Sequence, residues 1–181
     1  MEKVLALGES MGFSAKNVDN YGGHIDFSGK TDRIMGIIGH LDVVPAGSGW
    51  DFDPYGGELS EGKIYGRGTT DDKGPVISCL YAMKALKDAG YEPNCTIRLI
   101  IGLDEETHWK GIKYYFEHEQ KPDFGFTPDA DFPVINGEKG MLIFDFAKKI
   151  TPPQGQAKGL KLRSLKGGTA PNSVADSCRA V

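Results

Sequence analysis

Short apolar runs alternate with longer amphipathic segments over the first two thirds of the chain. The run Ile34–Ile38 predicts a buried strand, and Thr96–Ile101 and the short run Phe124–Phe126 predict two further strands. The segments between them carry apolar residues at helical spacing. This alternation is typical of βα units, so the predicted fold class is α/β, with a mostly parallel sheet flanked by helices.

Two helices are predicted between these strands. The first can begin at Pro75, because the first position of a helix needs no amide hydrogen, and Gly90 can end it in a left-handed conformation. Its buried face is predicted to consist of Val76, Leu80 and Met83. The second is predicted to bury one face formed by Trp109, Ile112, Tyr115 and Phe116.

Turn-rich segments divide the rest of the chain. Glu58-Leu59 and Lys63–Tyr65 are candidate hairpin arms, and a second hairpin is predicted between Phe132 and Ile150. Thr151–Gln156 contains no core-forming residue and is interpreted as a linker. We therefore predict one domain over residues 1–150, with the linker and the beginning of a second domain over residues 151–181.

Composition narrows the function classes. The chain has 181 residues, 39% of them hydrophobic, and a formal net charge of −4 without a basic block, which makes nucleic acid an unexpected partner. No apolar run approaches the roughly 18 residues of a membrane span, and Glu2, Lys3 and Glu9 interrupt the apolar stretch that a signal peptide needs. Three widely spaced cysteines indicate no disulfide framework. A cytoplasmic protein without membrane contact is expected.

Each predicted strand is followed by residues that can bind metal. These residues are His40 and Asp42 after the first strand, Asp104, Glu105 and Glu106 after the second, and Asp129 and Asp131 after the third. Asp71 and Asp72 precede the helix at Pro75. Ligand sites in open α/β sheets lie beyond the carboxyl ends of the strands, so we expect these side chains to converge at one edge.

A bound cation would allow so many carboxylates to lie in one cleft. Crowded carboxylates repel one another and raise each other's pKa unless a positive charge neutralises them. One imidazole among carboxylates suits Zn²⁺, with Co²⁺ or Mn²⁺ as substitutes. Any single acid after a strand can instead cap the N-terminus of a helix, so helix capping remains an alternative for each acid taken alone.

Four motifs together resemble the M20 family of metallopeptidases. They are Gly39–Pro45, Gly66–Gly74, Asp104–Thr107 and Thr127–Pro133. Within that family, Trp109–Tyr115 and Asn136–Gly140 are similar to segments of bacterial dipeptidases of the PepV type. The resemblance covers nearly the whole chain and implies a zinc-exopeptidase-like catalytic domain followed by the start of an α+β lid domain.

The resemblance implies a role for each motif residue. His40 and Asp129 would bind one zinc, Glu106 would help to bind a second, Asp71 would bridge the two, Asp42 would orient His40, and Glu105 would be the general base. A dipeptide or short peptide would be the substrate, cleaved by a metal-activated water. The resemblance also suggests a cis peptide bond between Asp71 and Asp72.

The chain departs from the family pattern after His118, because the further metal-binding histidine and the lid histidine of the family have no counterpart. A truncated chain with impaired activity is therefore expected, and if the chain proves active, His108 or a neighbouring subunit is the first candidate to complete the site. Two alternatives remain open, an M20-type deacylase of N-acyl amino acids and a non-catalytic metal-binding or peptide-binding fragment. The sequence does not predict the oligomeric state.

Overall fold

The structure is a computed structural model that describes residues 1–131, 133–140, 142–147, 159, 162–168, 174–175 and 177–181. The chain divides into two compact units, Met1–Val134 and Ile135–Val181. No helix in the described part of the chain is long and apolar enough to cross a membrane.

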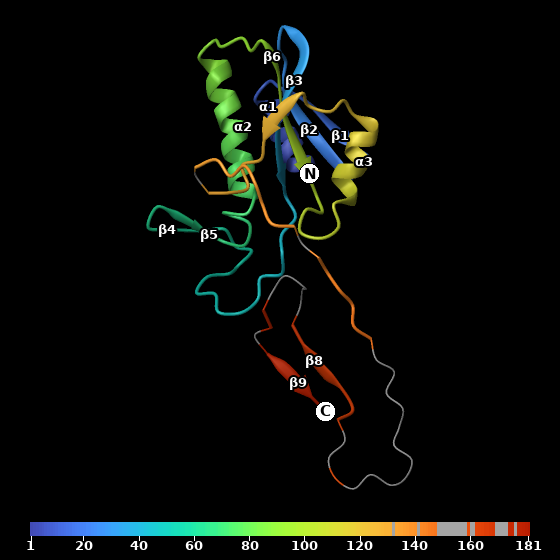
Figure 1. Cartoon of the computed structure of the whole chain (residues 1–181). Helices are drawn as coiled ribbons and strands as arrows, with labels where there is room; N and C mark the ends of the chain where they lie inside the picture. Colours follow the sequence, from blue (N-terminus) through green and yellow to red (C-terminus); the bar gives the residue numbers. More distant parts are fainter. Residues whose placement is uncertain (132, 141, 148–158, 160–161, 169–173, 176) are drawn as a thin grey trace. The chain divides into compact units, whose positions relative to one another are not determined.

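A five-stranded mixed sheet forms the centre of the first unit, in the order β1-β2-β6-β3-β7 (Figure 1). The strands are β1 Ser14–Val18, β2 Gly22–Phe27, β3 Thr31–His40, β6 Cys95–Gly102 and β7 Phe124–Phe126. β6, β3 and β7 run parallel, as expected for strands joined by helical crossovers. β2 pairs with β6 in antiparallel orientation, and β1 pairs with β2 in the same way at the edge of the sheet.

Helices cover both faces of this sheet. The helices are α1 Glu2–Ser10, α2 Lys73–Asp88 and α3 Lys110–His118. The main core joins apolar residues of α1 and α2 to Ile37, Leu99 and Ile101 on one sheet face. Tyr115 of α3 packs with Ile100 on the other face. The alternation along β6 therefore supplies both layers of the core.

The α/β class and the three strands predicted from apolar runs are confirmed. The sheet is mixed because the β1–β2 hairpin, which the sequence analysis did not predict, joins it antiparallel. The small hairpin of β4 Glu58–Ser60 and β5 Lys63–Tyr65 is confirmed, and it lies near the N-terminal end of α2 (Figure 1).

The two predicted helices exist, with corrections at their first turns. α2 buries Val76, Leu80 and Met83 as predicted, but it begins at Lys73, before Pro75. Trp109 was wrongly placed on the buried face of α3. It is the residue before that helix, with a left-handed φ of 56°, and it is 57% exposed.

The hairpin predicted between Phe132 and Ile150 is wrong for the residues described there, since residues 133–140 and 142–147 contain no strand. Val134 and Phe146 are 88% and 94% exposed. A stable hairpin needs an apolar face that packs against other side chains, whereas these two side chains are almost fully exposed. The second unit instead pairs β8 Leu165–Gly167 with β9 Cys178–Ala180. The predicted boundary at residue 150 lies outside the described residues.

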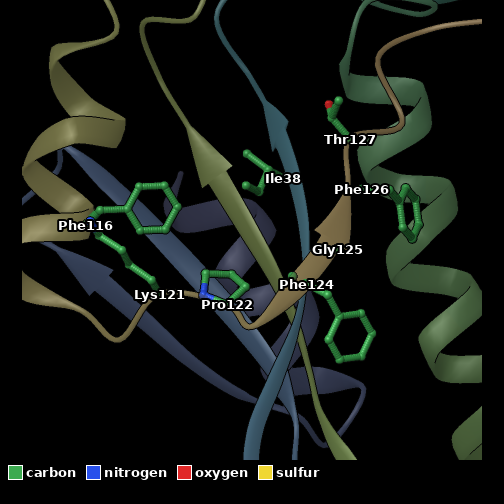
Figure 2. A pocket seen from close by; sticks show the side chains of 9 residues that line it. Ile38, Phe116, Lys121, Pro122, Phe124, Gly125, Phe126 and Thr127 are labelled. Carbon is green, nitrogen blue, oxygen red and sulfur yellow. The ribbon is translucent and has the colours of Figure 1, made fainter. Parts of the chain in front are cut away.

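An apolar cavity of about 460 Å³ borders the edge strand β7 (Figure 2). Its lining includes Ile38, Phe116, Pro122 and the backbone of Gly36 and Gly125. Lys121 is its only charged lining residue, and none of the acids that follow the strands reaches it. The catalytic chemistry suggested by the sequence therefore lies elsewhere.

Candidate metal centre

His40 ends β3 and is almost completely buried, with 2% of its surface exposed. The residue before it must be small. A Cβ at Gly39 would lie 2.5 Å from Cγ2 of Val76 and 2.6 Å from Oδ2 of Asp72. Glycine thus allows the start of α2 to pack directly on the end of β3, which places the two Asp residues beside the imidazole.

The Nε2 atom of His40 faces oxygen atoms from three other segments. It lies 3.1 Å from Oδ1 of Asp71 and 3.5 Å from Oδ2 of Asp129. Oε2 of Glu105 is 3.9 Å away. The ligand atoms of His40, Asp71 and Asp129 all lie within 4.8 Å of one another. These three side chains, which we call the His40 cluster, come from the ends of β3 and β7 and from the segment before α2.

The opposite nitrogen of the imidazole is already engaged. Nδ1 lies 3.0 Å from the carbonyl oxygen of Asp42 and 3.3 Å from its Oδ1. Because a carbonyl oxygen only accepts hydrogen bonds, this contact assigns the proton of a neutral imidazole to Nδ1. Nε2 is then left with a lone pair, and it is buried without a hydrogen-bond partner. Buried polar atoms rarely stay unpaired, and a metal ion is the partner that would complete this one.

Asp42 connects the imidazole to the loop after β6. Its Oδ1 and Oδ2 accept the backbone N–H groups of Glu105 and Glu106, at 3.2 and 3.1 Å. The carboxylate of Glu106 accepts the N–H of Val44. Glu106 therefore lies beside the His40 cluster and close to Asp71, without joining the three ligand atoms.

Burial and neighbouring charges shift the pKa values of the ionisable groups in the site. Burial and then the charge of Asp71 raise the pKa of Asp129. Burial raises the pKa of Glu105 as well, with further contributions from neighbouring carboxylates. Burial lowers the pKa of His40, but the Asp42 carbonyl and the nearby acids outweigh this effect, so its pKa is raised. Protons are thus held where a dication would replace them, and one imidazole with carboxylates is a donor set that fits zinc.

Asp72 holds the backbone of His40 in place, a role that was not predicted from the sequence. It is fully buried, and its Oδ2 accepts the backbone N–H of His40 at 3.2 Å. Burial raises its pKa to about 6. The bond between Asp71 and Asp72 is cis, as the family resemblance suggested.

The acids that follow the strands therefore separate into different roles. Asp104 is a helix cap, because its carboxylate accepts the N–H groups of Lys110 and Gly111 at 2.7 and 3.0 Å. Asp131 and His108 are exposed and make no contact with the His40 cluster in the described part of the chain. His24 is buried, and its Nδ1 lies 2.8 Å from the hydroxyl group of Tyr115.

Comparison with known proteins identifies the family. The family described as Peptidase family M20/M25/M40 matches residues 36–171, which include the whole His40 cluster. The chain belongs to this family. YtjP of Bacillus subtilis (strain 168) is 44% identical to this M20 chain over 181 residues, and the Beta-Ala-Xaa dipeptidase of Lactobacillus delbrueckii subsp. lactis is 45% identical over 181 residues. The chain spans 39% and 38% of the length of these two relatives.

Solved structures agree with this M20 assignment. Human carnosine dipeptidase 1 superposes on 73% of this chain, using 32% of its own, with a TM-score of 0.63 and 26% identity. The M20 family metallo-carboxypeptidase Sso-CP2 from Sulfolobus solfataricus covers 71% of this chain and 31% of its own with a TM-score of 0.62, and at 23% identity it supports the fold alone.

Proposed function

We propose that this M20 chain carries the metal site of a zinc-dependent dipeptidase. The observation that carries the proposal is the buried Nε2 of His40, which has no hydrogen-bond partner and faces Asp71 and Asp129. The Lactobacillus relative is a Beta-Ala-Xaa dipeptidase, which supports a dipeptide as the substrate. In such a substrate the second residue varies, whereas both termini remain free.

His40 and Asp129 are proposed to hold one zinc ion, Asp71 to bridge to a second, and Glu106 to help hold the second. Bound zinc would supply a water of lowered pKa and polarise the scissile carbonyl. Glu105 is proposed to act as the general base, a role supported by its carboxylate, which lies 3.9 Å from Nε2 of His40 and is about one third exposed. Its raised pKa suits a group that takes a proton from water and returns it to the leaving amine.

The ligand count limits the isolated 181-residue chain. In the described part of the chain, the first zinc would have His40, Asp71 and Asp129, whereas the second would have only Asp71 and Glu106. Catalytic zinc sites usually have three protein ligands. This chain is therefore proposed to bind one zinc tightly and a second weakly, and to hydrolyse dipeptides slowly.

The test is a comparison of Glu105→Gln and His40→Ala with the parent chain. Zinc content is measured by mass spectrometry, and hydrolysis is measured with β-Ala-Ala and with N-acetyl-alanine. The proposal expects Glu105→Gln to keep zinc but lose hydrolysis of β-Ala-Ala, and His40→Ala to lose both. Preferential hydrolysis of N-acetyl-alanine would instead establish a deacylase. Zinc binding without any hydrolysis would establish a binding module.

A further inference from the structure

A buried polar network joins α3 to the sheet, away from the candidate metal centre. α3 lies beside β2 (Figure 1), and its Tyr115 is fully buried there. The hydroxyl group of Tyr115 lies 2.8 Å from Nδ1 of His24 on β2, a side chain that is itself buried. The two rings meet edge to face, with their centres 5.7 Å apart. One hydrogen bond therefore connects the helix to a strand inside the sheet.

Arg98 on β6 fixes the direction of this hydrogen bond. Its guanidinium group hydrogen-bonds to the hydroxyl group of Tyr115, and an arginine can only donate. The hydroxyl oxygen thus accepts from Arg98 and donates its single hydrogen to Nδ1 of His24. Nδ1 is then the unprotonated nitrogen of the ring, and the proton of neutral His24 lies on Nε2. The hydrogen bond in this form requires a neutral imidazole.

The acids near His24 are already paired with cations. Arg98 donates to both carboxylate oxygens of Asp26, at 2.7 and 2.8 Å, whereas Nε2 of His24 lies 3.9 Å from that carboxylate. Lys16, opposite His24 on β1, pairs with Glu119 at the end of α3 at 2.6 Å. A proton on His24 would add a third positive charge to two ion pairs that are already balanced. Burial and then the charge of Arg98 accordingly lower the pKa of His24, although the two acids oppose this effect.

α3 also carries the loop that contains Glu105. The carboxylate of Asp104 accepts the N–H groups of Lys110 and Gly111 in the first turn of α3. The carbonyl oxygen of Asp104 accepts the N–H of Trp109 at 3.1 Å. Since Glu105 follows Asp104 directly, a displacement of α3 would displace this acid as well. The network under α3 is therefore connected to the loop after β6 through the backbone.

We propose that His24, Tyr115 and Arg98 form a latch, which holds α3 and the loop of Glu105 on the sheet and weakens when His24 takes up a proton. Protonated Nδ1 no longer accepts the hydroxyl hydrogen, so a buried donor loses its acceptor. The new charge also lies beside Arg98 in a site removed from water. Both effects favour an open state in which α3 separates from β2 and His24 is hydrated. This acid sensitivity is independent of the metal ligands.

The direction of the pH effect follows from the lowered pKa of His24. The closed state binds this proton more weakly than the open state, in which the imidazole has its ordinary pKa of about 6.5. The latch therefore stabilises α3 fully above about pH 6.5 and loses this stabilisation as the pH falls below it. For one such group, the ratio of open to closed molecules rises at most about tenfold between pH 7.5 and pH 5.5.

The first experiment titrates His24 by NMR in the zinc-free 181-residue chain. His24 should titrate below pH 6.5. Tyr115→Phe removes only the hydroxyl group, so protonation of Nδ1 no longer leaves a donor unpaired, and the pKa of His24 should rise. The control is His118→Gln, at an exposed histidine of α3, which should leave the titration of His24 unaltered. A parent His24 that titrates at pH 6.5 or above, or a pKa that does not rise in Tyr115→Phe, overturns the proposal.

The second experiment measures how often α3 opens. Zinc-free chain is treated with papain between pH 7.5 and pH 5.5, and cleavage within α3 is followed by mass spectrometry. Each rate is divided by that of a peptide of residues 104–120 at the same pH, so the ratio follows the open population. We expect a rise of several-fold in the parent and in His118→Gln, and none in His24→Gln, whose side-chain oxygen accepts the hydroxyl hydrogen at every pH.

The comparison with His24→Gln separates the latch from the carboxylates of the metal centre, which titrate in all these proteins alike. No rise in the parent, or the same rise in His24→Gln, overturns the proposal. An equal rise of cleavage within α2 also overturns it, because the whole unit would then be unfolding. If His24→Gln does not fold, the titration of His24 in Tyr115→Phe decides the question.

Discussion

Three consecutive acids after β6 perform three different tasks. Asp104 caps α3, the carboxylate of Glu105 approaches His40, and that of Glu106 accepts the N–H of Val44. Their side chains diverge because the backbone turns sharply between β6 and α3. A carboxylate is thus assigned to its function by the direction in which the backbone presents it, even where neighbours have the same chemistry.

Asp42 gives the first prediction at this scale. Its carboxylate contacts Nδ1 of His40 and accepts two backbone N–H groups, so it positions the imidazole without facing the cluster. We expect Asp42→Asn to weaken zinc binding about 10- to 100-fold, the usual effect of losing a partner of a ligating histidine. Competition with a chromogenic chelator measures the affinity. Asp131→Asn, a change in a nearby exposed acid, should leave it unaltered, and equal losses in both variants would contradict the assignment.

Asp72 gives a prediction about pH and stability. Its pKa is raised to about 6 in the folded chain, from about 3.8 in an unfolded chain, because it is buried. The folded state therefore holds this proton more tightly, so the stabilisation is present at low pH and is lost as the pH rises through 6.

Asp72→Asn removes this ionisation. In metal-free protein, we expect the free energy of unfolding of the variant, relative to the parent, to rise by about 2 kcal/mol between pH 4 and pH 7. Urea denaturation across that range measures the difference. A difference that does not change with pH would show that Asp72 has an ordinary pKa in the folded protein.

The sequence predicted that His40, Asp71 and Asp129 lie close together, because strand ends can be recognised locally, but it also placed Glu106 with them, which does not join their ligand atoms. His40, Asp71 and Asp129 all follow or precede elements that could be recognised from apolar spacing. The support given by Asp72 to the amide of His40 could not be predicted in the same way, since it depends on contact between segments 32 residues apart. Neither could the position of the Arg67 guanidinium over the ring of Trp50, which needs the fold of the loop after β3.

At the scale of elements, the short strand β7 carries a disproportionate part of the site. It pairs with β3 through only three residues, and Asp129 follows it closely.

The β1–β2 hairpin was not predicted because β1 is largely exposed and lacks an apolar alternation, whereas β2 carries His24 and Asp26 inside the sheet. Arg98 pairs with Asp26 there at 2.7 Å, a tertiary contact that apolar spacing does not reveal.

Gly125 tests how far the site depends on β7. A Cβ at this position would lie 1.9 Å from the backbone oxygen of Gly36, so β7 and β3 would have to separate. We expect Gly125→Ala to cost about 2 kcal/mol of stability or more, and to weaken zinc binding because Asp129 moves with the strand. Gly137→Ala, where no atom lies within 4 Å of the added Cβ, is the control. Unchanged zinc affinity in Gly125→Ala would mean that β7 does not position Asp129.

At the scale of the whole molecule, the core and the candidate site belong to one unit. Among the described residues, every buried hydrophobic side chain lies between Leu5 and Tyr115, and the His40 cluster ends at Asp129. The unit Met1–Val134 contains both. All three residues of the His40 cluster therefore come from this unit.

A fragment of residues 1–134 tests this independence. We expect it to unfold cooperatively and to bind its first zinc within about threefold of the affinity of the 181-residue chain, a difference of less than roughly 1 kcal/mol. Thermal denaturation followed by circular dichroism and a zinc titration provide the two measurements. A fragment that folds but binds no zinc would show that residues beyond Val134 contribute a ligand.

The two N–H groups bound by Asp42 also make the centre observable without a substrate. The amides of Glu105 and Glu106 lie in a loop, where hydrogen atoms normally exchange quickly with solvent, yet both donate to a carboxylate that itself contacts the buried imidazole. Deuterium can enter at these positions only when the loop separates from the end of β3. Exchange at these two amides therefore measures how often the candidate centre opens, and a bound cation that closes it would slow both amides together.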